Sequence, residues 1–306
     1  MGSYFVRRGL RTILVLAVAS IAVFYGLRIA PGDPTGGVLS PTALEEVREA
    51  YRQRLGLDQP IWVQYGVYLQ NLAQGNFGSS LVTGKSIQEL LGYYGRNSLV
   101  LGLAATLLIY GIGLPLGALA AARRNTAVDH VITGVSIAGM GMPNFWLALL
   151  LIYFFASRLH WLPSGGCCEP DQLILPAVVL AAEGAAVTIR MTRSSMLEQL
   201  GADYVRTHRA KGLSETVVVY GRVFRNALNP LISLAGLRLG WLVGYALIVE
   251  TIFQWPGIGY LLVDSILRRD YPVAQFFSLL LVAIVVTANL LADVAYGIAD
   301  PRIRHA

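Results

Sequence analysis

The sequence predicts an all-α integral membrane protein with six spanning helices, and three observations lead to this prediction. The chain has 306 residues, of which 55% are hydrophobic and 14% charged, whereas soluble domains carry roughly 25% charged residues. Its apolar residues form unbroken runs, and about 20 such residues suffice to cross a bilayer. The net charge of +6 comes from cations at the ends of these runs rather than along one polar face, which excludes a nucleic-acid partner.

The apolar runs divide the chain into four regions. Residues 1–30 are expected to form an N-terminal transmembrane helix and residues 31–96 an extracytoplasmic segment with short helices. Residues 97–298 form a core of five spans, and residues 299–306 a cytoplasmic tail. The six predicted spans lie at about 11–30, 97–121, 131–156, 173–195, 231–253 and 276–298.

Basic residues set the orientation of these spans. Three arginines precede the first apolar run, which is too long for a secretory signal and has no small-residue cleavage site after it. We therefore expect a retained first helix whose N-terminus is cytoplasmic. Arg268 and Arg269, in the last outer loop, are an exception to the rule that cytoplasmic loops carry the excess of cations. The inner side is defined by Arg7, Arg8, Arg11, Arg123, Arg124, Arg206, Arg209, Lys211, Arg222, Arg225, Arg302 and Arg304.

Two segments between the spans are too large to be simple turns. In the outer segment, Thr42 followed by Glu45 gives a capping-box pattern that opens a helix to about Leu55. A second short helix is expected over Ile61–Leu72. The inner segment, at about 196–230, is basic and has helical spacing. An ordered basic loop of this size is typical of a docking surface.

The sequence contains no complete motif for catalysis. Gly84-Lys85-Ser86 lacks the first glycine of a phosphate-binding loop, follows no predicted strand and lies on the outer face. The four histidines have no metal-ligand spacing, and no catalytic grouping can be built from the sequence. The chain is therefore predicted not to be an enzyme and to bind no metal. The adjacent Cys167 and Cys168 are expected to be free thiols, because a ring between neighbours is strained.

Among the ionisable residues within the predicted spans, three are singled out here: Glu183, Arg238 and Asp293. Such a residue costs at least ~2.5–3.5 kcal/mol in a bilayer and usually faces a cavity or a partner. Glu183 and Arg238, with Asn144, are the candidate residues of a translocation pathway, and a structural ion pair is the alternative for the two charges. For Asp293 we favour snorkelling to the interface.

The inner segment contains the run Asp203-Tyr-Val-Arg-Thr-His-Arg-Ala-Lys-Gly-Leu213, followed by Arg225-Asn-Ala-Leu-Asn-Pro230. It closely resembles the EAA-type loop in permease subunits of binding-protein-dependent ABC importers, and within them the peptide/nickel branch. The resemblance covers essentially the whole chain in order. The other similar stretches are Pro31-Gly-Asp-Pro34, Leu55-Gly-Leu-Asp-Gln-Pro60, Met142-Pro-Asn-Phe-Trp146, Trp161-Leu-Pro-Ser164, Glu250-Thr-Ile-Phe-Gln-Trp-Pro-Gly-Ile-Gly259, Arg269-Asp-Tyr-Pro272 and Asp300-Pro-Arg-Ile-Arg304.

This resemblance implies a type I importer transmembrane domain of six helices with a cytoplasmic coupling helix that docks on an ATPase. At position 208 the family usually has Ala, where this chain has His208. The implied partners are a second, homologous permease, two ATPases that use ATP and Mg, and an extracytoplasmic solute-binding protein. The implied location is the bacterial inner (plasma) membrane, with both termini cytoplasmic. The implied coupling residues are Asp203, Tyr204, Arg206, Thr207, His208, Arg209, Lys211, Gly212 and Leu213.

The expected solute is a short peptide, and two kinds of alternative stay open at the level of the sequence. The same machinery can import a nickel chelate or metallophore. A more distant alternative is an ion-coupled secondary transporter, which predicts paired broken helices and a titratable site at the midplane and gives the 196–230 loop no purpose. A membrane enzyme would need a catalytic pair in the spans, and the sequence offers none.

Overall fold

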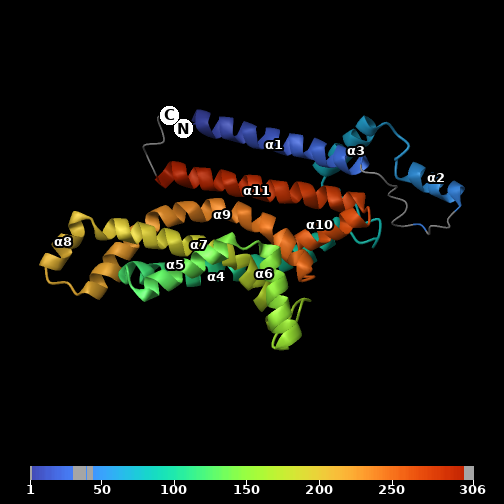
Figure 1. The fold of residues 1–306 in the computed structure, drawn as a ribbon. Helices are drawn as coiled ribbons and strands as arrows, with labels where there is room; N and C mark the ends of the chain where they lie inside the picture. Colours follow the sequence, from blue (N-terminus) through green and yellow to red (C-terminus); the bar gives the residue numbers. More distant parts are fainter. Residues whose placement is uncertain (1, 30–38, 40–43, 300–306) are drawn as a thin grey trace. The chain divides into compact units, whose positions relative to one another are not determined.

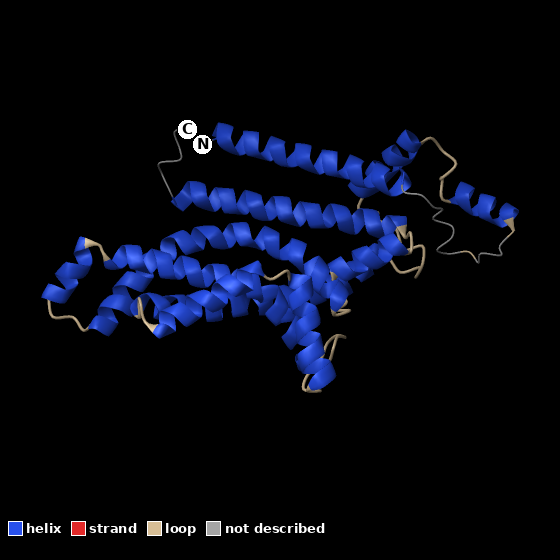
Figure 2. Cartoon of the chain, viewed as in Figure 1, coloured by secondary structure: helices blue, strands red, loops and turns tan. Residues whose placement is uncertain are grey.

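A computed structural model describes the backbone of residues 2–29, 39 and 44–299, and the side chains of these residues outside 2–8, 232–239 and 291–299. The described chain is a set of helices joined by short loops (Figures 1 and 2). Among the described residues, the only strand-like pairing is an isolated bridge between Ser79 and Ser86. The all-α prediction is therefore confirmed.

The chain divides into two compact units. The first comprises Met1–Ser98 and Pro256–Thr287, and the second comprises Leu99–Trp255 and Ala288–Ala306. Two long helices, α4 (Ile87–Ala122) and α11 (Tyr271–Ala299), contribute residues to both.

In the first unit, aromatic side chains join α1 (Gly2–Ile29) to α3 (Ile61–Ala73). Phe24 is 1% exposed, and its ring centroid lies 5.0 Å from that of Tyr65. The Tyr65 hydroxyl donates to Oγ of Ser20 at 3.3 Å. The polar helix α2 (Glu45–Arg54) and α3 match the two short helices predicted for the outer segment. Thr42, and with it the proposed capping box, lies outside the described residues.

The first unit also contains contacts between residues far apart in sequence. Asp270, which precedes α11, is 4% exposed and accepts hydrogen bonds from Ser80 Oγ and from the Leu81 N–H. Asn97 donates to the Pro256 carbonyl at 3.1 Å, next to α10 (Ile258–Leu267). Because a buried carboxylate needs such partners, these bonds hold the turn before α4 against the start of α11.

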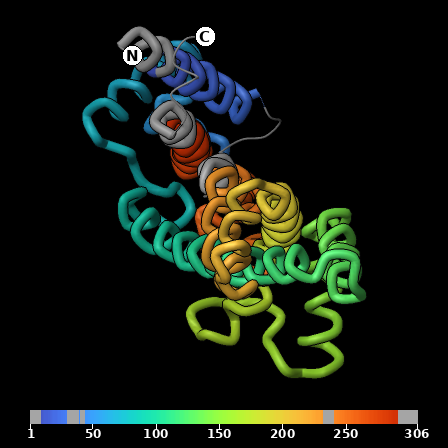
Figure 3. Tube along the Cα trace, turned by 90° about the vertical axis from the view of Figure 1, so that its left-hand side faces the viewer, coloured from blue at the N-terminus to red at the C-terminus, as the bar shows by residue number. Residues whose placement is uncertain are grey.

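The second unit is built around α7 (Pro170–Leu200) and α9 (Phe224–Ile252), which lie side by side (Figure 3). Glycines allow close contact between α4 and α7. A Cβ placed on Gly113 would lie 2.7 Å from Cβ of Thr188, and one on Gly117 would lie 2.6 Å from the Ile189 carbonyl oxygen. These small residues thus serve helix packing within the subunit.

The six predicted spans all fall on helices, but they differ in continuity. Four helices within the described residues are long and apolar enough to cross a membrane: Gly9–Ile29, Ile87–Ala122, Pro170–Leu200 and Tyr271–Leu290. In α9, the side chains at 232–239 lie outside the described residues, and Gly240–Ile252 is its described apolar part. Large apolar side chains such as Leu14, Val18 and Leu107 are exposed, as expected where lipid is the solvent.

The third predicted span is not one straight helix. α5 (Ala127–Gly141) is followed by α6 (Asn144–Leu151) and a π-helical turn, η2 (Ile152–Arg158), and the two parts meet at 107°. Met142 has extended backbone angles, as a residue before proline prefers. A break at Pro143 therefore interrupts the apolar run, and the two helical parts form a fifth candidate span if the broken pair crosses the membrane.

The prediction of free thiols at Cys167 and Cys168 is wrong, because the structure contains a disulfide between them. The loop that holds them is folded tightly rather than extended. Gly166 and Cys168 both have positive φ, and the Gly166 N–H donates to the Phe253 carbonyl at 3.0 Å. This backbone brings the two neighbouring sulfur atoms into reach of each other.

Candidate functional site

The basic inner segment folds into a short helix, α8 (Asp203–Ala210), between the end of α7 and a π-helical turn, η3 (Val217–Val223). Val205 anchors α8 because its side chain is fully buried. Valine and methionine side chains from α7 and η3 pack around it, among them Met196, Val218 and Val223. Removing such apolar surface from water contributes roughly 1.5–3 kcal/mol for a fully buried side chain of this size. The helix is thus fixed to the rest of the unit along one face.

Tyr204 and His208 lie together on the partly buried side of α8. The Tyr204 hydroxyl donates to Oε1 of Gln199, at the end of α7, at 3.0 Å. Its ring meets the His208 imidazole edge-on, with centroids 6.0 Å apart. His208 therefore supports the orientation of Tyr204 in place of a small alanine.

The opposite face of α8 is polar and open to solvent. Asp203, Arg206, Thr207 and Arg209 are exposed, as is Lys211 directly after the helix. This arrangement presents cations on a helix whose other face is held by the unit. Its exposed cations can therefore face an acidic or polar partner surface.

The turn after α8 is a Schellman motif. Gly212 has φ +77, its N–H donates to the Arg209 carbonyl at 2.9 Å, and the Leu213 N–H donates to the His208 carbonyl. This pair of bonds satisfies the last carbonyls of the helix, and glycine adopts the left-handed conformation without a steric cost. The turn at Gly212 thus ends α8 sharply.

A bidentate ion pair closes the loop beyond this turn. Nε and Nη2 of Arg209 donate to the two carboxylate oxygens of Glu215 at 3.0 and 2.5 Å. Hydrogen bonds from the guanidinium hold the pKa of Glu215 below its usual value, and the carboxylate raises the pKa of Arg209. Arg209 therefore fixes the shape of the loop besides contributing charge to the exposed face.

A second ion pair ties α5 to α7 just before α8. Nε and Nη2 of Arg193 donate to the two oxygens of Asp129 at 2.6 and 2.8 Å. Asp129 is 1% exposed and also accepts bonds from the Asn125 N–H and the Thr133 hydroxyl. A buried carboxylate with all these donors is well compensated. The pair could not be predicted from the sequence, because its members are 64 positions apart.

The two candidate pathway residues whose side chains are described, Glu183 and Asn144, do not line the same cavity. Glu183 lines a small cavity of about 30 Å³ with Thr188, Trp241 and Tyr245 in the second unit. Asn144 is 8% exposed at the start of α6 and is not among the residues that line this cavity. The side chains of Arg238 and Asp293 lie outside the described residues.

Comparison with known proteins places the chain in a family. Residues 113–305 match the family described as the inner membrane component of binding-protein-dependent transport systems, and residues 1–101 match the N-terminal region of such membrane components. The chain belongs to this family. It is a multi-pass membrane protein with the all-helical fold of a type I importer permease.

Curated relatives match along nearly their whole length. The chain is 40% identical to the oligopeptide transport system permease protein AppB of Bacillus subtilis, with each chain fully covered. It is 42% identical to the di/tripeptide transport system permease protein DppB of Pseudomonas aeruginosa, over 94% of each chain. It is 39% identical to the glutathione transport system permease protein GsiC of Escherichia coli, again with both chains fully covered.

Membership of this family sets aside two of the alternatives raised by the sequence. An ion-coupled secondary transporter and a membrane enzyme are different classes of protein from a binding-protein-dependent permease. The chain is thus a transport subunit.

Proposed function

We propose that this chain is the permease subunit of an ATP-driven importer of short peptides. The observation that carries the proposal is α8: a short helix fixed on one face and presenting Arg206, Arg209 and Lys211 on the other. Two ATPase subunits that close on ATP need a rigid element through which to move a permease. A helix anchored by Val205 and closed by the Gly212 turn meets that need.

The proposal includes the partners and the orientation. α8 and both termini lie in the cytoplasm, where basic residues are concentrated. A second, homologous permease completes the pathway, and a solute-binding protein delivers the solute from outside. ATP and Mg are used by the ATPase subunits, while this chain binds no cofactor. Residues 31–96 and the loop after α9 are the outer segments that meet the binding protein.

Short peptides are the favoured solute because of the names of the relatives. AppB, DppB and GsiC are named for oligopeptides, for di- and tripeptides, and for glutathione, which is a tripeptide. None of these three names refers to nickel. Glu183, in its small cavity, and Arg238 are the residues of this chain that we propose to contact the charged ends of a peptide.

The test is the ATPase activity of the complete complex, reconstituted in lipid with its binding protein. A panel of di- and tripeptides and of nickel chelates is supplied, and the complex without binding protein serves as the control. Stimulation by peptides is the expected result. Stimulation by a nickel chelate alone would mean that the solute is a nickel chelate and not a peptide. ATPase activity that is the same with and without the binding protein would contradict the importer mechanism.

A further inference from the structure

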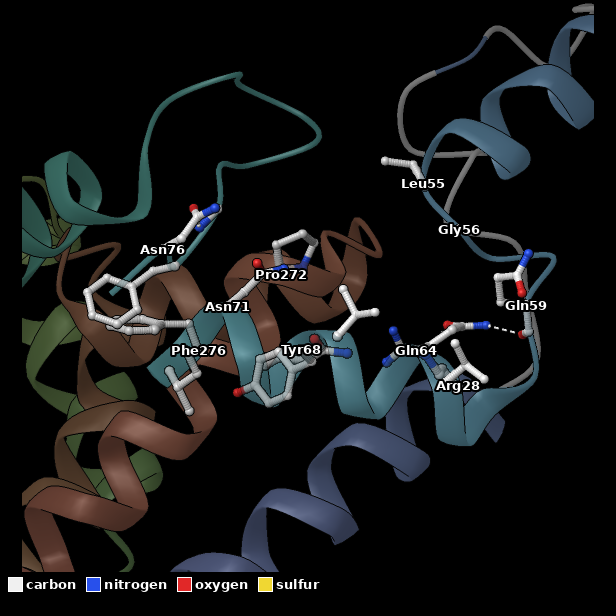
Figure 4. Close-up of a pocket in the computed structure, with 16 residues that line it drawn as sticks. Arg28, Leu55, Gly56, Gln59, Gln64, Tyr68, Asn71, Asn76, Pro272 and Phe276 are labelled. Carbon is white, nitrogen blue, oxygen red and sulfur yellow. Dashed lines mark hydrogen bonds between the residues drawn. The ribbon is translucent and has the colours of Figure 1, made fainter. Parts of the chain in front are cut away.

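The first unit contains a pocket of about 290 Å³ that the proposed import function does not use. It lies between the end of α1, α3, the segment at 76–78 and the start of α11 (Figure 4). Small-molecule sites typically measure ~300–1,000 Å³, so this volume fits a small ligand. All of its lining residues belong to one unit.

Arg28 supplies a positive charge to this pocket. Its Nε–H donates to Oε1 of Gln64 at 2.8 Å, and its guanidinium carbon lies 3.5 Å from the centroid of the Phe24 ring. Nη1 makes one further, longer contact with the Phe24 carbonyl. These partners carry no negative charge. A guanidinium has five N–H donors in a planar fork that matches a carboxylate, so Arg28 retains donors for an anionic group.

Gln275, at the start of α11, supplies the second observation. The residue is 5% exposed, it lines the pocket, and its Nε2 is buried without a hydrogen-bond partner. A buried donor left without an acceptor costs ~1–3 kcal/mol. The side chain therefore lacks an acceptor that a ligand in the pocket would provide.

Tyr68 also lines the pocket and offers a further donor (Figure 4). Burial raises the pKa of its hydroxyl, so this group stays protonated and able to donate at neutral pH. Arg28, Tyr68 and Gln275 thus favour a ligand that carries oxygen acceptors.

Much of the remaining wall is apolar, and Gln59, Asn71 and Asn76 are its other polar side chains. Val63, Val67, Phe77 and Phe276 line the pocket, and the rings of Phe77 and Phe276 pack 4.8 Å apart. Such a wall fits an aliphatic group. Arg28 is the one cation among the described residues that line it, so the pocket suits a single negative charge better than a phosphate dianion.

We propose that this pocket binds a small monocarboxylate that has an apolar side chain and an amide, as in an N-acylated amino acid. The carboxylate contacts Arg28, the carbonyl oxygen accepts a bond from Gln275 or Tyr68, and the side chain lies on the apolar wall. The proposal goes beyond peptide import and does not depend on it. Binding is measured directly on the chain, so its failure would leave the import assay unaffected.

The test is calorimetric titration of the full chain in lipid nanodiscs. The probes are N-acetyl-leucine, its neutral amide N-acetyl-leucinamide, and inorganic phosphate. N-acetyl-leucine is expected to bind, and loss of its charge is expected to weaken binding about tenfold or more. This comparison uses the unaltered protein, so it does not depend on the folding of any variant.

Two variants and a matched control locate the site. Arg28→Gln is expected to weaken N-acetyl-leucine binding about tenfold, and Gln275→Leu to weaken it by a smaller factor. Arg268→Gln removes an arginine that is paired with Asp264 outside the pocket and should leave binding unchanged.

Several results would overturn the proposal. These are equal binding of the acid and the amide, tighter binding of phosphate, and an unchanged affinity in both Arg28→Gln and Gln275→Leu.

Discussion

At the scale of single residues, the proposed coupling role of α8 depends on the backbone conformation of Gly212. Its φ of +77 costs an L-residue ~1–2 kcal/mol, so Gly212→Ala should loosen the turn after α8 and lower peptide uptake several-fold. Gly212→Pro should abolish uptake, because proline fixes φ near −65° and removes the N–H that bonds Arg209. Uptake by cells is measured at equal membrane content of the permease.

Gly201, at the other end of α8, gives the matched control for this prediction. It has φ −80, and a Cβ there would make an ordinary contact 3.5 Å from the Glu198 carbonyl oxygen. Gly201→Ala should therefore leave uptake close to normal. Normal uptake in a well-inserted Gly212→Pro variant would refute the assignment of α8 as the coupling helix.

Individual residues of the site also differ in how far they could be predicted from the sequence. Gly212 could be identified as a turn, because glycine after a helical stretch has a local conformational reason. The Arg193–Asp129 pair and the Arg28 pocket could not, because their partners come from distant positions and depend on packing. The same holds for the Cys167–Cys168 disulfide, which depends on the anchored backbone at Gly166.

At the scale of elements, the packing of α4 on α7 depends on glycine. The Cβ of alanine at position 117 would lie 2.6 Å from both the Ile189 carbonyl oxygen and Cβ of Thr192. A backbone oxygen cannot move aside as the end of a flexible side chain can, so α4 and α7 must separate. Gly117→Ala is expected to destabilise the protein by ~1–3 kcal/mol, as overpacking does. Thermal unfolding of the purified permease measures this loss.

The same helix provides the control. A Cβ on Gly111 would meet nothing within 4 Å, and alanine is a better helix former than glycine. Gly111→Ala should therefore keep or slightly raise the unfolding temperature. Equal unfolding temperatures for Gly117→Ala and Gly111→Ala would mean that close contact between α4 and α7 does not contribute to stability.

The sequence predicts well which segments form helices, and it predicts less well where some of these helices begin. α3 begins at the predicted Ile61, and α2 ends at Arg54, one residue before the predicted end at Leu55. α4 begins at Ile87, some ten residues before the predicted span at 97, because polar residues such as Glu89 and Arg96 do not end a helix. Hydropathy detects the part of a helix that lies in lipid and not the helix itself.

At the scale of the whole molecule, the broken helix pair decides the topology. If α5, α6 and η2 together cross the bilayer, the loop between η2 and α7 lies outside and α8 lies inside. If the pair enters and returns on the same side, both of these locations are reversed, because α7 still separates them. The basic residues of α8 and its surroundings favour the first arrangement, which agrees with docking on cytoplasmic ATPases.

Cysteine labelling tests this arrangement. Ser164, in the loop after η2, and Ser214, after α8, are both exposed, and serine to cysteine is a small change. Cys167 and Cys168 are first replaced by serine. A membrane-impermeant maleimide should label Ser164→Cys on intact spheroplasts, and should label Ser214→Cys only after permeabilisation. Labelling of Ser214→Cys from outside, with Ser164→Cys protected, would mean that the bent pair is re-entrant and that α8 cannot reach an ATPase in the cytoplasm.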